Sequence, residues 1–132
     1  MSDKLPLYVP QSPMRIKALE IFLLSKNISQ YFVEQMATLD KNGSEHKSIY
    51  FTGDIVQQSG SLFPEIINAE EKTFSEDKYR HIASVKQLTH SLYKNCQLLE
   101  KSVPHNGKEF LQLLQNELKR FRKLQRIWRL TL

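Results

Sequence analysis

Apolar residues recur every three or four positions through four long segments of the chain, which is the spacing of helices with one buried face. The first segment spans residues 13–39. Ser12 followed by Pro13 is a typical helix start, because serine caps the N-terminus and proline suits the first turn. A broad apolar face is predicted for this helix, formed by Ile16, Leu19, Leu23, Leu24, Ile28, Tyr31, Phe32, Met36 and Leu39.

The second segment, 49–71, has the same spacing but contains a proline. Its periodic positions are Ile55, Val56, Ser59, Leu62, Phe63, Ile66 and Ile67. Pro64 lies inside the segment with Gly60 close by, and an internal proline removes one backbone hydrogen bond of the helix. We therefore predict a helix that is kinked near Pro64.

The third and fourth segments are the most regular. Segment 76–101 follows Ser75 and opens with two acidic residues, which favour the positive end of the helix dipole. It carries a heptad-like seam of Ile82, Val85, Thr89, Leu92, Cys96 and Leu99. Segment 107–130 places on one side Phe110, Leu114, Leu118, Phe121, Leu124 and Trp128. Both segments are predicted to be helices with one apolar side.

Stretches rich in turn-forming residues, at 40–44, 72–75 and 102–107, separate the four segments. Amphipathic helices joined by short connections must bury their apolar faces against one another. We therefore predict an all-α fold, an antiparallel up-down four-helix bundle over residues 13–132. Residues 1–12 are predicted to form an extended N-terminal arm, because prolines flank an apolar stretch there; the arm either docks on a neighbour or packs loosely on its own bundle.

The composition is that of a single globular domain. The 132 residues are 40% hydrophobic and 25% charged, and the longest aliphatic and aromatic run is residues 21–24. The first residues lack the apolar core of a signal peptide, and the single cysteine cannot form an internal disulfide. These features predict a cytoplasmic protein.

Residues that carry enzyme or metal chemistry form no recognisable motif. The glycines match neither a dinucleotide fingerprint nor a phosphate loop, and no histidine follows a glutamate at the spacing of a di-iron bundle. Asp77 and His81 lie one turn apart, which is more typical of a solvated pair than of a metal site, and Cys96 falls in the apolar seam as a small core residue. We expect no catalytic residue, no metal and no cofactor; an enzyme that uses His81 or His90 is the alternative.

Positive charge is concentrated near the C-terminal end. Residues 1–100 hold 11 Lys or Arg against 12 Asp or Glu, whereas residues 101–132 hold 8 against 2, so the two parts carry −1 and +6. The last predicted helix contains six cations in 11 residues with no acid among them: Lys119, Arg120, Arg122, Lys123, Arg126 and Arg129. At 100° per residue, all except Arg120 fall within an arc of about 120°, roughly opposite the apolar side.

Such a ridge of cations predicts an anionic partner, because the like charges repel one another when they are left unpaired. The phosphates of RNA or DNA fit, since arginine binds phosphate oxygens through two parallel hydrogen bonds. Contact with the backbone is expected rather than base reading, because no base-reading motif is present. The alternatives are a solvated helix end whose cations complement the helix dipole, and a helix that lies on a membrane surface.

The length, the four predicted helices and the second helix resemble a known family. Residues 57–70 read Gln-Gln-Ser-Gly-Ser-Leu-Phe-Pro-Glu-Ile-Ile-Asn-Ala-Glu, with small residues before a proline and Ala-Glu after it. This stretch resembles the second helix of the four-helix-bundle proteins encoded in 23S ribosomal RNA intervening sequences, together with the accessory variability determinant (Avd) proteins of diversity-generating retroelements. The resemblance implies a basic homo-oligomer, often a pentamer, that binds nucleic acid and assists a reverse transcriptase in mutagenic retrohoming.

Two functions follow from these observations. The first is a non-enzymatic nucleic-acid-binding accessory protein that assists a reverse transcriptase and its template RNA, with the six cations on phosphates. The second is an oligomeric helical interaction scaffold whose basic helix docks on an acidic protein. Nucleic acid that co-purifies and is removed by nuclease favours the first, and a stoichiometric protein partner in nuclease-treated extract favours the second.

Overall fold

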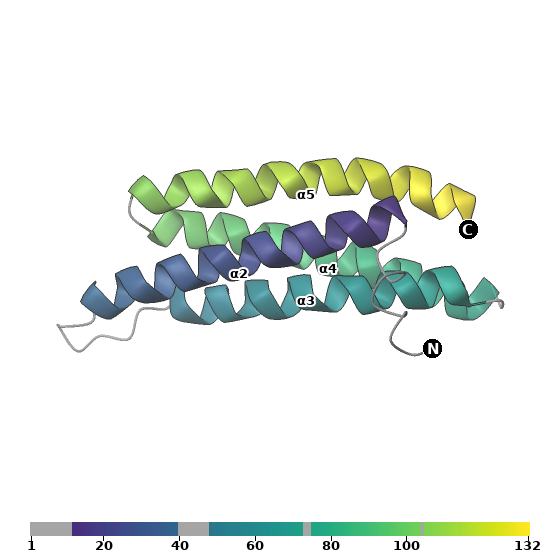
Figure 1. Ribbon diagram of the computed structural model, residues 1–132, viewed down its shortest axis with the longest axis horizontal. Helices are drawn as coiled ribbons and strands as arrows, with labels where there is room; N and C mark the ends of the chain where they lie inside the picture. Colours follow the sequence, from purple (N-terminus) through teal and green to yellow (C-terminus); the bar gives the residue numbers. More distant parts are fainter. Residues whose placement is uncertain (1–11, 40–47, 73–74, 104) are drawn as a thin grey trace, which may run out of the picture.

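The computed structural model describes residues 12–39, 48–72, 75–103 and 105–132, and these ranges contain four helices and no strand (Figure 1). The helices are α2 (Pro13–Leu39), α3 (Ser48–Glu71), α4 (Ser75–Ser102) and α5 (His105–Thr131). Consecutive helices run in opposite directions, and each packs on two neighbours in the order α2, α3, α4, α5 and back to α2. The predicted antiparallel up-down four-helix bundle is confirmed. The predicted arm, apart from Ser12, lies outside the described residues.

The helix starts follow local sequence signals. The Ser12 side-chain Oγ accepts a hydrogen bond from the backbone N–H of Arg15 at 3.1 Å, as predicted for an N-cap. The third helix begins at Ser75, one residue earlier than predicted. Pro64 lies inside α3, which continues through it to Glu71.

The core forms where the four apolar faces meet. Five of the six predicted seam positions of α4 are buried, with Val85, Thr89, Leu92, Cys96 and Leu99 each at most 1% exposed, whereas Ile82 is half-buried. The Thr89 hydroxyl is satisfied inside this seam, because its Oγ1 donates to the Val85 carbonyl at 2.7 Å. Within the described ranges, every buried side-chain nitrogen and oxygen has a hydrogen-bond partner. The apolar side chains of the core are therefore buried together, and the polar side-chain atoms buried with them have hydrogen-bond partners.

Among the residues whose side chains the structure describes, which do not include Met36 and Leu39, three apolar positions were predicted wrongly. Ile16 and Leu23 are 45% and 58% exposed. On a helix of 100° per residue, both point to the side of α2 opposite the buried Ala18, so the apolar arc predicted for α2 was too wide. Phe110 is 42% exposed and lies at the rim of the bundle, where its ring centroid is 4.8 Å from that of Tyr31 on α2.

Candidate functional site

The six predicted cations all lie on α5, and they occupy two of its sides. Five are exposed and Arg122 is half-buried; the five are Lys119, Arg120, Lys123, Arg126 and Arg129. Arg122, Arg126 and Arg129 lie toward α4. Lys119 and Lys123 each lie three residues before one of these arginines, which places them on the adjoining strip of the helix. Arg120 lies toward α2, beside Glu117.

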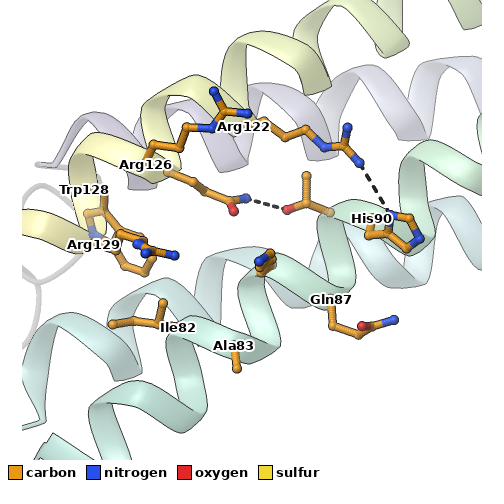
Figure 2. A pocket seen from close by; sticks show the side chains of 11 residues that line it. Ile82, Ala83, Gln87, His90, Arg122, Arg126, Trp128 and Arg129 are labelled. Atoms are coloured by element: carbon orange, nitrogen blue, oxygen red, sulfur yellow. Dashed lines mark hydrogen bonds between the residues drawn. The ribbon is translucent and has the colours of Figure 1, made fainter.

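A groove of ≈ 690 Å³ lies between α4 and the C-terminal part of α5 (Figure 2). We call it the basic groove. Six of its lining residues belong to α4 and five to α5: Ile82, Ala83, Lys86, Gln87, Thr89 and His90, and Arg122, Gln125, Arg126, Trp128 and Arg129. In Figure 2, Arg122 and Arg126 extend from α5 at the upper edge, opposite Ile82 and Ala83 on α4.

Positive charge dominates this groove. Its lining contains Lys86, Arg122, Arg126 and Arg129, and none of the eleven lining side chains carries a carboxyl group. Cations that line one concave surface add their potentials, which raises the local concentration of an anion. The basic groove is therefore suited to an anionic ligand.

Two side chains of α4 hold Arg122 at the edge of the basic groove. Its guanidinium carbon lies 4.9 Å from the centroid of the Tyr93 ring, a cation–π contact. Its Nη2 also donates to His90 Nδ1 at 3.5 Å. A guanidinium has five N–H donors and the His90 contact uses one, so Arg122 is oriented while it keeps donors for an anion.

The inner wall is fixed by hydrogen bonds to other helices. Trp128 is only 7% exposed, and its indole Nε1 donates to Glu70 Oε2 on α3 at 3.0 Å. The other Glu70 oxygen accepts from Arg15 Nε on α2 at 2.5 Å. Gln125 Nε2 donates to Thr89 Oγ1 at 2.6 Å, which links α5 to α4. The wall of the groove is thus set by the packing of all four helices.

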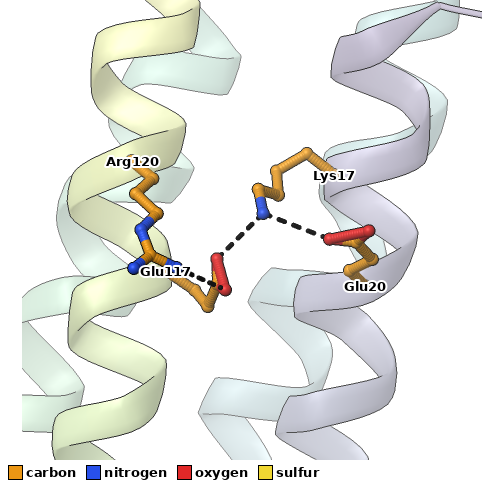
Figure 3. Close-up of polar contacts among 4 residues, drawn as sticks. All are labelled: Lys17, Glu20, Glu117 and Arg120. Atoms are coloured by element: carbon orange, nitrogen blue, oxygen red, sulfur yellow. Dashed lines mark hydrogen bonds and ion pairs between the residues drawn. The ribbon is translucent and has the colours of Figure 1, made fainter.

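The opposite side of α5 carries ion pairs (Figure 3). Arg120 Nη1 lies 3.2 Å from Glu117 Oε1, and the second Glu117 oxygen accepts from Lys17 Nζ on α2 at 2.9 Å. Lys17 also reaches Glu20 at 3.1 Å. The Lys17–Glu117 hydrogen bond lowers the pKa of Glu117 and raises the pKa of Lys17. Arg120 is therefore partly neutralised by its own helix, unlike the cations of the basic groove.

We did not predict from the sequence that α4 contributes residues to this site. Lys86, His90 and Tyr93 follow one another at helical spacing beside the apolar seam, so they form one polar stripe on α4. Their spacing in the sequence is enough to predict this stripe. Its position opposite the α5 arginines, however, depends on how the two helices pack.

The remaining candidates for chemistry have structural partners. Asp77 pairs with Arg80 at 2.6 Å, and His81 Nδ1 lies 2.6 Å from Glu65 Oε2, so Asp77 and His81 face different groups. Burial raises the pKa of Cys96 to about 12, which keeps the thiol protonated at neutral pH. Over the part of the chain that the structure describes, no three His, Cys, Asp or Glu residues gather as metal ligands.

Comparison of the chain with protein-family models, with curated proteins and with solved structures found no match. None of the described helices is long and apolar enough to cross a lipid bilayer. The basic groove and the adjoining cations of α5 are therefore the features from which a function is inferred.

Proposed function

We propose that this protein is a non-enzymatic nucleic-acid-binding accessory protein, which contacts the phosphates of RNA or DNA through α5 and the facing side of α4. One observation carries the proposal: the cations toward α4 line a groove whose eleven described lining residues include no acidic residue. With the adjoining lysines, the contacting set is Lys86, Lys119, Arg122, Lys123, Arg126 and Arg129.

Phosphate is the anion that fits this surface best. At 1.5 Å per residue, the stretch 119–129 of α5 is about 15 Å long. A duplex strand carries one phosphate per ~3.4 Å, so several phosphates lie within reach of such a stretch. Arginine supplies paired donors that match two phosphate oxygens, and three of the six proposed contacts are arginines.

The two alternatives, a solvated helix end and a helix on a membrane surface, account for fewer of these observations. A helix dipole favours cations only in the last turn, and Arg129 is the one basic residue in the last turn of α5. A membrane-surface helix needs a free apolar face along its length, but the main apolar face of α5, with Leu111, Leu114, Leu118 and Phe121, is fully buried in the bundle. Neither alternative explains why Lys86 of α4 lies across the groove from the α5 arginines.

The resemblance of residues 57–70 to the Avd group extends the proposal to a partner and an assembly. The protein would assist a reverse transcriptase and its template RNA, acting as a homo-oligomer. A cyclic assembly such as a pentamer repeats the same basic surface in every subunit. Weak phosphate contacts on neighbouring subunits then bind one strand together, which raises the overall affinity without any new contact.

The salt dependence of binding tests the proposal. Six phosphate contacts predict that log affinity falls against log salt with a slope of about −4 for a single strand and about −5 for a duplex. Changing Arg122, Arg126 and Arg129 together to glutamine should reduce that slope by about 2 to 3, as measured by fluorescence anisotropy of a labelled oligonucleotide.

A matched control removes the same charge elsewhere. Arg80, Lys94 and Lys101 are exposed cations of α4 that do not line the basic groove. Their triple glutamine variant should bind nearly as the unmodified protein does. Binding that ignores salt, or equal binding by the two triple variants, would reject phosphate contact through α5.

A second candidate function, a scaffold for an acidic protein partner, is favoured by one observation. Apolar side chains are exposed beside the cations of α5, with Ile127 64% and Leu130 82% exposed. A protein interface combines an apolar centre with charged surroundings, whereas a phosphate backbone offers no apolar surface that an isoleucine side chain could contact. If this function is correct, Ile127→Asn should abolish capture of a partner from nuclease-treated extract and leave oligonucleotide binding unchanged.

A further inference from the structure

The basic groove contains more than phosphate contacts require. Three of its lining residues are apolar, Ile82 and Ala83 on α4 and Trp128 on α5, and we call them the apolar part of the groove. The volume of ≈ 690 Å³ lies inside the range of about 300–1,000 Å³ that is typical of ligand pockets. A ridge of cations alone would contact duplex and single strand alike, whereas apolar side chains beside the cations can also contact a base.

The bases of a duplex cannot reach this apolar part. The groove lies between two packed helices, each about 10–12 Å across with its side chains, and the major groove of DNA is only about 12 Å wide. A pair of helices side by side therefore stays outside, and meets only the phosphates. In a single strand the bases are unstacked and can turn toward the protein while the phosphates stay on its surface.

We infer that the basic groove binds an unpaired nucleotide of single-stranded RNA or DNA. A phosphate lies among the cations at the edges, and the base lies against Ile82, Ala83 and Trp128. Gln87 and His90 line the same groove and present polar groups to the edge of a base. The inference rests on the proposed function and adds to it the form of nucleic acid that this site selects.

The chain carries its own reporter for this site. Trp128 is the single tryptophan of the sequence and lines the groove. An oligothymidylate of about 12 nucleotides should quench its fluorescence and bind about tenfold more tightly than a hairpin duplex of equal phosphate number. The duplex should leave the fluorescence unchanged while it still binds in a salt-dependent way.

A substitution that fills the groove separates the base from the phosphates. Ala83 is exposed on α4, so Ala83→Phe occupies the apolar part without altering charge or core. We expect this variant to lose the quenching and about tenfold in affinity for oligothymidylate, and to keep its affinity for the duplex. Gln97→Phe places the same side chain at an exposed position of α4 outside the groove and serves as the control.

The outcomes distinguish this inference from the function on which it rests. Equal, salt-dependent binding of single strand and duplex, without quenching, overturns the inference and leaves the proposed function standing. Absence of salt-dependent binding to either form overturns both. Oligoglutamate that quenches Trp128 and competes as strongly as oligothymidylate places an acidic peptide in the groove, and also overturns the inference.

Discussion

α5 presents cations on two sides, and the two sides differ in what they face. Toward α2, Arg120 meets Glu117, which also binds Lys17, so each cation lies against a carboxylate of the same chain. Toward α4, Arg122 meets the Tyr93 ring and His90 in a groove where none of the described lining residues has a carboxyl group. The positions of the carboxylates, rather than the number of cations, therefore decide which side is open to an external anion.

The two sides also contribute differently to stability. The Lys17–Glu117 pair links two helices at 2.9 Å with both side chains 23% exposed, and such a pair stabilises a fold by up to about 1 kcal/mol. Arg122 and Arg126 are four residues apart with like charge, an arrangement that costs a few tenths of a kcal/mol in a helix. The ion pairs on the side toward α2 thus add some stability, and the like charges on the side toward α4 cost some stability that a bound anion would restore.

We call the side of α5 toward α4 the open side and the side toward α2 the paired side. The largest effect is expected when the open side is made to resemble the paired side. Ala83→Glu with Gln87→Glu places two carboxylates among the cations of the basic groove. Internal ion pairs then compete with phosphate, and affinity for an oligonucleotide should fall at least about tenfold in anisotropy measurements near 0.1 M salt.

The control for this variant adds the same charge away from the groove. Gln97→Glu with Gln30→Glu changes two exposed glutamines, one on α4 and one on α2. Salt screens charges beyond about 10 Å at this ionic strength, so the loss should stay within about twofold. Equal losses in the two double variants would mean that net charge, and not the groove, governs binding.

Most of the fold could be predicted because it depends on local spacing. Ser12 signals the start of α2 through a hydrogen bond to a residue three positions away, and the α4 seam from Val85 to Leu99 needs only the heptad rule. The predicted burial of Ile16 and Leu23 was wrong because α2 has more apolar residues than its buried arc can hold. Which of them faces the core depends on where the neighbouring helices lie, which periodicity within one segment does not specify.

For the same reason, only the part of the candidate site that lies on α5 could be predicted. The side shared by Arg122, Arg126 and Arg129 follows from the helical period of α5, and the pairing of Arg120 with Glu117 could have been read from their three-residue separation. Lys86 and Tyr93 could not be assigned, because their approach to the α5 arginines depends on the packing of α4 against α5. Local charge patterns are visible in a sequence, whereas the partners of those charges on other helices are not.

A smaller effect is expected when the paired side is made to resemble the open side. Glu117→Gln removes the carboxylate shared by Lys17 and Arg120, so the free energy of unfolding in urea should fall by about 0.5–1 kcal/mol. The released Arg120 lies outside the contacting set, so oligonucleotide affinity should rise by no more than about twofold. Glu109→Gln, at an exposed position of the same helix, makes the same change in net charge and should alter neither quantity measurably.

The smallest effect is the pH dependence of the paired side. The hydrogen bond from Lys17 lowers the pKa of Glu117 below its ordinary value of 4.5, so the unfolded chain binds this proton more readily than the folded chain. The stabilisation is therefore complete above pH 4.5 and is lost as the pH falls through the lower pKa of the folded state. The same contact raises the pKa of Lys17 above 10.5, so on the alkaline side its contribution is complete below pH 10.5 and is lost as the pH rises beyond it.

Urea unfolding of the unmodified protein and of Glu117→Gln over a pH series measures this dependence. The difference between their free energies of unfolding should stay constant between about pH 6 and pH 9 and shrink as the pH falls below 4.5. Glu109→Gln should track the unmodified protein throughout, since Glu109 is exposed on α5. If the difference for Glu117→Gln does not shrink as the pH falls below 4.5, protonation of Glu117 does not remove the stabilisation. The two sides of α5 then differ in packing rather than in ion pairing.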